Sequence, residues 1–152
     1  MRHSTLASAL AVVWLLAITP AAHAGELVRT EDFTLETWYE LEDGDGPIQL
    51  HRVRLDPKEG RVTKSSLFRP HNNEYLQTLG IQLEYTNTSD QKWDARINVR
   101  WLDEDGEVID GFSGNETLSK KSAQKIVSMS VSTLKYGLAR AKTLEIEIHY
   151  EP

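Results

Sequence analysis

The sequence predicts an all-β protein that folds as an antiparallel β-sandwich of about seven to nine strands. Two observations carry this prediction. Several segments in the second half of the chain alternate apolar and polar residues with a period of two, so each has one apolar and one polar face. Polar turn residues separate these segments, and strands with one solvated face are typical of antiparallel sheets.

The first 24 residues have the layout of a cleavable signal peptide. Arg2 gives a basic start, residues 10–18 carry no charge, and Ala22-His23-Ala24 is a small-x-small cleavage site. The alternative, a membrane anchor, needs about 20 consecutive apolar residues, and this run is much shorter. We therefore expect an exported chain without a transmembrane anchor, whose mature form, residues 25–152, is a single domain.

The first half of the mature chain has a less regular pattern. Residues 25–47 form an acidic N-terminal segment with eight acidic residues and one basic residue, and the following 25 residues contain six basic and two acidic residues. Either two neighbouring surface elements compensate each other's charge, or the acidic segment binds a partner. Strands are expected over residues 33–39, 48–55 and 61–68, with turns at residues 42–47, 56–60 and 69–73.

The second half supplies the clearest strands, over residues 81–85, 95–101, 127–131 and 144–150. Asp105-Gly106 is a strong hairpin signal, and a returning strand is expected from Val108, ending at residues 111–115. One short helix is expected near residues 133–142, with Ser132 as its cap. The expected core comprises Ile81, Leu83, Tyr85, Ile97, Val99, Trp101, Leu144, Ile146 and Ile148.

Composition narrows the classes of function. The 152 residues include no cysteine, which excludes disulfides, thiol catalysis and thiolate metal sites. Without Arg2 the chain has 16 basic and 23 acidic residues, a net charge of −7, so it lacks the basic footprint that nucleic-acid binding needs. Export without cysteine favours a bacterial periplasm, with an extracellular location as the alternative. No cofactor is expected.

Acidic turns are the candidate metal ligands. They do not fit an EF-hand: aligning Gly106 with the invariant glycine of that loop places Phe112 at the closing ligand, where a carboxylate is needed. Hydrophilic turns are therefore the favoured interpretation. A weak surface Ca²⁺ site at Asp103, Asp105 and Asp110 stays open as the alternative.

The sequence contains no recognisable catalytic motif. His51, His71 and His149 show no zinc-binding spacing, and His149 is expected to face solvent because its neighbours Ile148 and Tyr150 are apolar. There is no Gly-x-Ser-x-Gly elbow and no glycine-rich phosphate loop. A hydrolase that uses a surface carboxylate pair stays an alternative, because acids distant in sequence can meet in space.

Two tryptophans are the candidate partner contacts. Trp101 lies on the apolar face of its strand and is expected in the core. Trp93 is in register with the same face, which favours the core, but it stands at the strand start between Lys92 and Asp94. Half exposure is the alternative, and an exposed tryptophan at this edge would be a candidate contact for a ligand or partner. Trp38, within the acidic segment, is the second candidate.

A family resemblance covers about 50 residues, from residue 80 to residue 131. One strand ends in Asn87-Thr88-Ser89, the next ends in Trp101-Leu102-Asp103, and an Asp-Gly hairpin follows. This stretch resembles the centre of FxLYD-type immunoglobulin-like domains and is similar to YcfL-type bacterial periplasmic lipoproteins. The resemblance implies an immunoglobulin-like sandwich without established catalysis. Leu102 stands where an aromatic residue is usual, and the lipid-attachment cysteine is missing, so a free protein is expected.

These observations favour a non-catalytic, soluble periplasmic binding or accessory module that acts through an edge or a face of the sandwich. The expected partner is another envelope protein or a polymer. The two alternatives are the carboxylate-pair hydrolase and a weak Ca²⁺-binding protein that uses the acidic turns.

Overall fold

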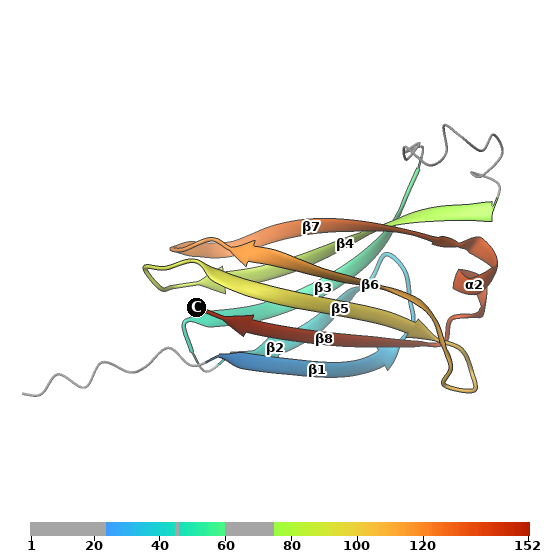
Figure 1. Cartoon of the computed structure of the whole chain (residues 1–152), viewed down its shortest axis with the longest axis horizontal. Coiled ribbons are helices and arrows are strands. Elements are labelled where there is room, and N and C mark those ends of the chain that lie inside the picture. Colours follow the sequence, from blue (N-terminus) through green and yellow to red (C-terminus); the bar gives the residue numbers. More distant parts are fainter. Residues whose placement is uncertain (1–23, 45, 60–74) are drawn as a thin grey trace, which may run out of the picture.

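The computed structural model describes residues 24–44, 46–59 and 75–152 (Figure 1). This part of the chain contains eight strands and one short helix. The strands are β1 (Gly25–Asp32), β2 (Trp38–Asp43), β3 (Ile48–Lys58), β4 (Leu76–Asn87), β5 (Trp93–Leu102), β6 (Val108–Leu118), β7 (Ser122–Leu134) and β8 (Thr143–Glu151), and the helix is α2 (Lys135–Arg140).

The eight described strands form two four-stranded antiparallel sheets. The strand order is β1-β8-β5-β6 in the first sheet, called sheet 1 below, and β2-β3-β4-β7 in the second, called sheet 2. Figure 1 shows the two sheets as two layers, with α2 at one end. The all-β antiparallel sandwich predicted from the sequence is therefore confirmed, and so is a short helix within residues 133–142.

The core lies between the facing sides of the two sheets. Every core residue that the sequence predicts is fully buried. The less regular first half adds a second set of buried side chains, which comprises Leu27, Tyr39, Leu41, Ile48, Leu50, Val53 and Leu55. Burial of one aliphatic side chain of this size stabilises the fold by about 1.5–3 kcal/mol. In a chain without disulfides, this apolar burial is the main favourable contribution to stability.

The prediction of a strand over residues 33–39 is wrong. The backbone instead forms β1 up to Asp32, turns through Glu36 at a φ of 60°, and enters β2 at Trp38. The Phe33 N–H donates to the Lys142 carbonyl at 2.8 Å, and its ring centroid lies 6.3 Å from that of Trp101. Apolar side chains in this connection therefore close one end of the core rather than line a strand.

The predicted C-terminal ends of β3 and β6 are also wrong, because each strand continues through a proline or a glycine, residues that commonly end strands. β3 passes through Pro57 to Lys58, where the missing proline N–H is tolerated because β2 pairs only as far as Arg54. β6 continues past Gly114 to Leu118, and the space that a Gly114 side chain would occupy is filled by the Phe112 ring. The strand and turn expected over residues 61–68 and 69–73 lie outside the described residues.

The helix α2 begins one residue after β7 ends. Its N-cap is Leu134, without a side-chain hydrogen bond, so the expected capping role of Ser132 is wrong. Ser132 lies inside β7 opposite Thr78 of β4, where strand pairing fixes its backbone. The helix is therefore held by its packing at the end of the sandwich rather than by a polar cap.

Asn87 organises the turn between β4 and β5. Its side chain is fully buried, and its Nδ2 donates to the carbonyls of Gln91 at 3.0 Å and Leu118 at 3.1 Å. Its Oδ1 accepts the N–H of Ser89 at 2.9 Å and the Ser89 hydroxyl at 2.7 Å. One amide thus joins this turn to the end of β6.

Replacement of Asn87 by alanine is expected to lower the free energy of unfolding by about 2–4 kcal/mol, because several buried polar groups lose their partner at once. Urea unfolding measures this loss. The control is Asn98→Ala, since Asn98 accepts only an exposed bond from Ser113 in the described part of the chain, and a cost below about 1 kcal/mol is expected there. Equal costs for the two variants would contradict the assigned role.

Tyr39 ties the β1–β2 connection together. Its hydroxyl lies 2.5 Å from both the N–H and the carbonyl oxygen of Thr34, so it accepts from one and donates to the other. Burial raises the pKa of the Tyr39 phenol above its ordinary value of 10.0, and the nearby Glu31 and Asp32 add to that shift, while the bonds to Thr34 oppose it. The neutral phenol is therefore favoured in the folded protein.

A raised folded-state pKa means that Tyr39 contributes stability below pH 10 that is lost as the pH rises from 10 toward the folded-state pKa. We expect the urea midpoint of the native protein to fall more steeply between pH 9 and pH 11 than that of the Tyr39→Phe variant. Identical slopes for the two proteins would show that the Tyr39 proton is not linked to folding.

Candidate functional site

The edge strands of the two sheets, called margins below, are the first candidate surface, because an edge strand exposes unpaired backbone N–H and C=O groups. The margins are β1 and β6 in sheet 1, and β2 and β7 in sheet 2. Charged side chains commonly protect such strands from pairing with other chains. β1 carries four charges in eight residues, β2 carries three in six, and β6 carries two together with two glycines.

The β7 edge lacks that protection. Residues 126–134, with the sequence Ile-Val-Ser-Met-Ser-Val-Ser-Thr-Leu, contain no charge, glycine or proline. Their pairing with β4 runs without a register shift from Ile126 to Leu134. On the inner face Met129 and Thr133 are buried and Val127 and Val131 are half-buried, whereas Ile126, Ser128, Ser130, Ser132 and Leu134 are exposed. This segment, called the β7 edge below, is a regular strand with one free side in the described structure.

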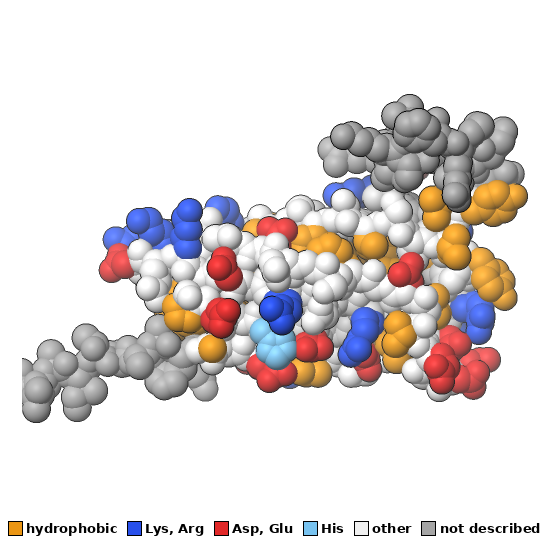
Figure 2. Space-filling view, viewed as in Figure 1, with side chains coloured by type: hydrophobic (Ala, Val, Ile, Leu, Met, Phe, Trp, Pro, Cys, Tyr) orange, Lys and Arg blue, Asp and Glu red, His pale blue; other side chains and the backbone are white. Residues whose placement is uncertain are grey.

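An apolar surface continues from the C-terminal end of the β7 edge. Leu134 is 57 % exposed, Tyr136 on α2 is 75 % exposed, and Val108 at the start of β6 is 54 % exposed. These side chains border a hollow of about 300 Å³ whose wall also contains Ile109 and Thr133, together with the charged Asp103, Asp110 and Arg140. Figure 2 shows hydrophobic side chains along β7 and at the end of the molecule near α2.

The hypothesis that Trp93 is a partner contact is wrong. Its side chain is fully buried, and its indole Nε1 donates to the Ser89 hydroxyl at 3.2 Å. Leu118 of β6 lies opposite Trp93, and the ring centroid of Tyr150, a residue of β8, is 6.1 Å from that of Trp93. The alternation of β5 therefore extends to the first residue of the strand, where neighbouring strands cover the ring.

Trp38 lies on the outer side of sheet 2 and is half buried. The guanidinium of Arg52 is 4.4 Å from the ring centroid, and that of Arg54 is 5.8 Å away, which are cation–π distances. Arg52 in turn donates to the buried carboxylate of Glu84 at 2.7 Å. Pairing of β2 with β3 thus places part of the acidic segment, residues 25–47, beside Arg52 and Arg54. This agrees with the interpretation that two neighbouring surface elements compensate each other's charge. Contact between Trp38 and a partner stays a prediction.

The carboxylates of Asp103 and Asp110, in and after the turn that follows β5, already accept hydrogen bonds from other groups of the protein. Asp103 accepts the N–H groups of Asp105 and Glu107, both at 3.0 Å, and pairs with Arg140 at 3.1 Å. Asp110 accepts from the Gly111 N–H at 2.8 Å and from the Thr133 hydroxyl at 2.6 Å. The three carboxylates proposed for Ca²⁺ are not gathered around one point.

Millimolar Ca²⁺ is therefore expected to leave the thermal unfolding midpoint unchanged, because ion binding would have to break the bonds that Asp103 and Asp110 already accept. Differential scanning fluorimetry with CaCl₂ and with EDTA measures this. A Ca²⁺-dependent rise that disappears in the Asp105→Asn variant would instead establish the calcium site.

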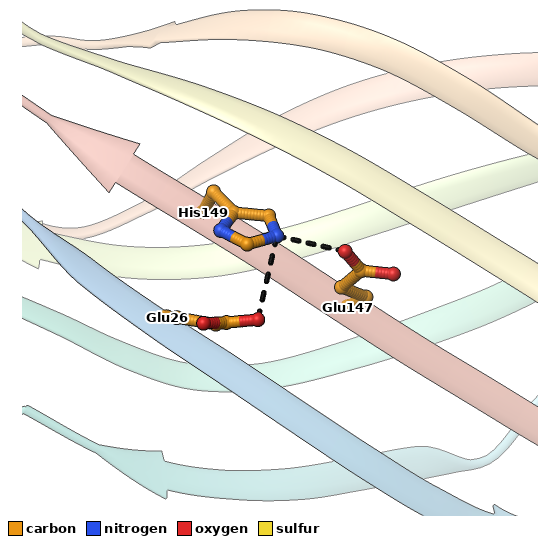
Figure 3. A group of neighbouring side chains, drawn as sticks. All are labelled: Glu26, Glu147 and His149. Atoms are coloured by element: carbon orange, nitrogen blue, oxygen red, sulfur yellow. Dashed lines mark hydrogen bonds and ion pairs between the residues drawn. The ribbon is translucent and has the colours of Figure 1, made fainter.

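The structure brings together a different group. Glu26 of β1, Glu147 and His149 of β8 form, within the described residues, the one set of three side chains whose ligand atoms lie within 4.8 Å of one another (Figure 3). His149 Nε2 is 2.7 Å from Glu147 Oε1 and 3.5 Å from Glu26 Oε1. His149 thus lies on the solvent face, as predicted. His51 instead bonds to Thr86, and His71 lies outside the described residues.

A second, larger hollow of about 520 Å³ adjoins this group. His149, Arg96, Asp94, Asn115 and Glu116 belong to its wall. Asp94 and Glu116 thus line a concave surface, and hydrolysis by a carboxylate pair stays a prediction. Sequence reasoning missed the whole group, although the two-residue spacing of Glu147 and His149 places them on one face of a strand.

Comparison with models of known protein families finds no match to this sequence, and comparison with characterised proteins finds none either. Within the described residues, no helix has the length and apolar character to cross a membrane.

Proposed function

We propose that this protein is a non-catalytic binding module of the bacterial periplasm, which takes up an extended segment of another envelope protein as an added strand beside β7. The observation that carries the proposal is the uncharged β7 edge. Nine successive residues without charge, glycine or proline offer backbone groups to a partner strand, whereas every other margin of the described sandwich carries several charges or glycines.

The chemistry of the surface defines the partner segment. Main-chain hydrogen bonds would give affinity, and alternate side chains of the added strand would give specificity. The small serines at positions 128, 130 and 132 leave room on the outer face, and the hollow beside Leu134 and Tyr136 can take an apolar side chain. An uncharged, extended peptide ending in an apolar residue fits this surface best.

The proposal includes an immunoglobulin-like classification, which the strand order supports. The order β3-β4-β7 in sheet 2 corresponds to strands A-B-E of such a domain, and β6-β5-β8 in sheet 1 corresponds to C′-C-F. β1 then takes the position of strand G from the opposite end of the chain. Domains of this architecture commonly serve recognition, although fold alone does not define function.

The double variant Ser128→Lys/Ser130→Lys tests the β7 edge, because lysine on an edge strand opposes strand addition while both positions are already exposed. The matched control is Thr30→Lys, at an exposed position on the already charged β1. We expect cross-linking in intact cells to trap a partner with the native protein and with Thr30→Lys, and to lose it with the β7 variant.

Hydrogen exchange of the trapped complex gives the decisive second measurement. The backbone amides of residues 126–134 should exchange more slowly when the partner is bound. Protection confined to other strands, or equal cross-linking by all three proteins, would refute the proposal. A concentration-dependent homodimer that the β7 variant abolishes would mean that a second copy of the chain, and not another protein, occupies the edge.

A further inference from the structure

The outer face of sheet 1 brings three potential metal ligands from two strands to one point. His149 lies on β8, and Glu26 is its direct partner across the β1–β8 pairing. Glu147 lies two residues before His149, so its side chain projects from the same face. Figure 3 shows dashed lines from one imidazole nitrogen of His149 to a carboxylate oxygen of Glu26 and to one of Glu147.

We propose that Glu26, Glu147 and His149 bind a divalent transition-metal ion, with Zn²⁺ as the best fit. One imidazole and two carboxylates supply the nitrogen and oxygen ligands that Zn²⁺ takes, and their two negative charges balance those of the ion. Ca²⁺ and Mg²⁺ are poorer fits because they prefer shells made only of oxygen. Three protein ligands leave coordination positions for water.

The distances already approach those of a bound ion. Zn–N and Zn–O bonds of about 2.0–2.2 Å in a tetrahedron place the ligand atoms roughly 3.3 Å apart. His149 Nε2 is 3.5 Å from Glu26 Oε1 and 2.7 Å from Glu147 Oε1. An ion would therefore replace the His149–Glu147 contact after a small side-chain rotation, without a change in the backbone.

Exposure makes the group accessible from solvent. The side chains of Glu26, His149 and Glu147 are 58 %, 43 % and 30 % exposed, and His149 also lies in the wall of the larger hollow. Arg96 of β5 lies directly across from His149 in the β5–β8 pairing. Its positive charge disfavours a cation, so the site is suited to reversible rather than permanent binding.

A bound ion would connect β1 to β8. β1 is an edge strand whose only buried side chain is that of Leu27, so few apolar contacts hold it. A ligand that binds the folded chain alone raises its stability by mass action. Zn²⁺ should therefore raise the thermal unfolding midpoint, and it should do so only while Glu26 is present to link the two strands.

Isothermal titration of the tag-free protein with ZnCl₂, after treatment with EDTA, tests the site. One ion per chain is expected, with MgCl₂ giving no heat. Loss of a ligand should weaken binding at least about tenfold, so His149→Ala and Glu147→Gln are the test variants. Glu26→Gln should abolish the Zn²⁺-dependent rise in the unfolding midpoint.

Matched controls are available on the same surface. Glu145, two residues before Glu147, has a similar exposure but pairs with Arg100 at 2.9 Å, so Glu145→Gln should bind Zn²⁺ as the native protein does. His51→Ala, on sheet 2, should also bind normally. Absence of heat from the native protein, unchanged binding by His149→Ala, or equal weakening by Glu145→Gln would each overturn the proposal. Circular dichroism confirms that every variant is folded.

Discussion

The rest of the structure depends on the packing of two apolar sheet faces against each other without any covalent cross-link. The chain contains no cysteine, so β4, β5 and β8 must fix the relative position of the sheets through buried side chains alone. Trp101, Tyr85 and their aliphatic neighbours are fully buried on these strands. Because close packing of the interior resists distortion, the outer faces and the margins can vary in chemistry without loss of the fold.

The sequence predicts best where a strand has one buried and one solvated face. Alternation identified β4, β5 and β8, and every core residue predicted in them is buried, although Leu79, Trp93 and Ala95 belong to the same core and were not included in the predicted set. It failed for β1, where only Leu27 is buried and charges occupy several of the other positions. Phe33 and Leu35 imitate a strand because they are spaced by two, although they close the end of the core from a turn. Trp93 was misjudged because its charged neighbours in sequence do not reveal the cover that β6 and β8 provide.

The candidate sites required three-dimensional information for a similar reason. Glu147 and His149 are visible together in the sequence, but Glu26 lies more than 100 residues away and joins them only through the register of β1 and β8. The uncharged character of residues 126–134 can be read in the sequence, yet their position at a margin depends on which strands become neighbours. Local patterns predict the faces of a strand, whereas its partners follow from the packing of the whole chain.

The β7 edge must stay unpaired to bind a partner strand, whereas β1, at the opposite side of the sandwich, needs further contacts to stay in place. β6 and β7 lie at one side, and β1 and β2 lie at the other, so strand addition beside β7 leaves Glu26 and His149 untouched. A binding edge must stay open, and β7 can stay open because β4 pairs with it along almost its full length. β1 has less apolar support, because Leu27 is its only buried side chain. An edge strand with few buried side chains opens more readily than the strands of the core, so a metal ion bound between Glu26 and β8 would add a connection where apolar packing is sparse.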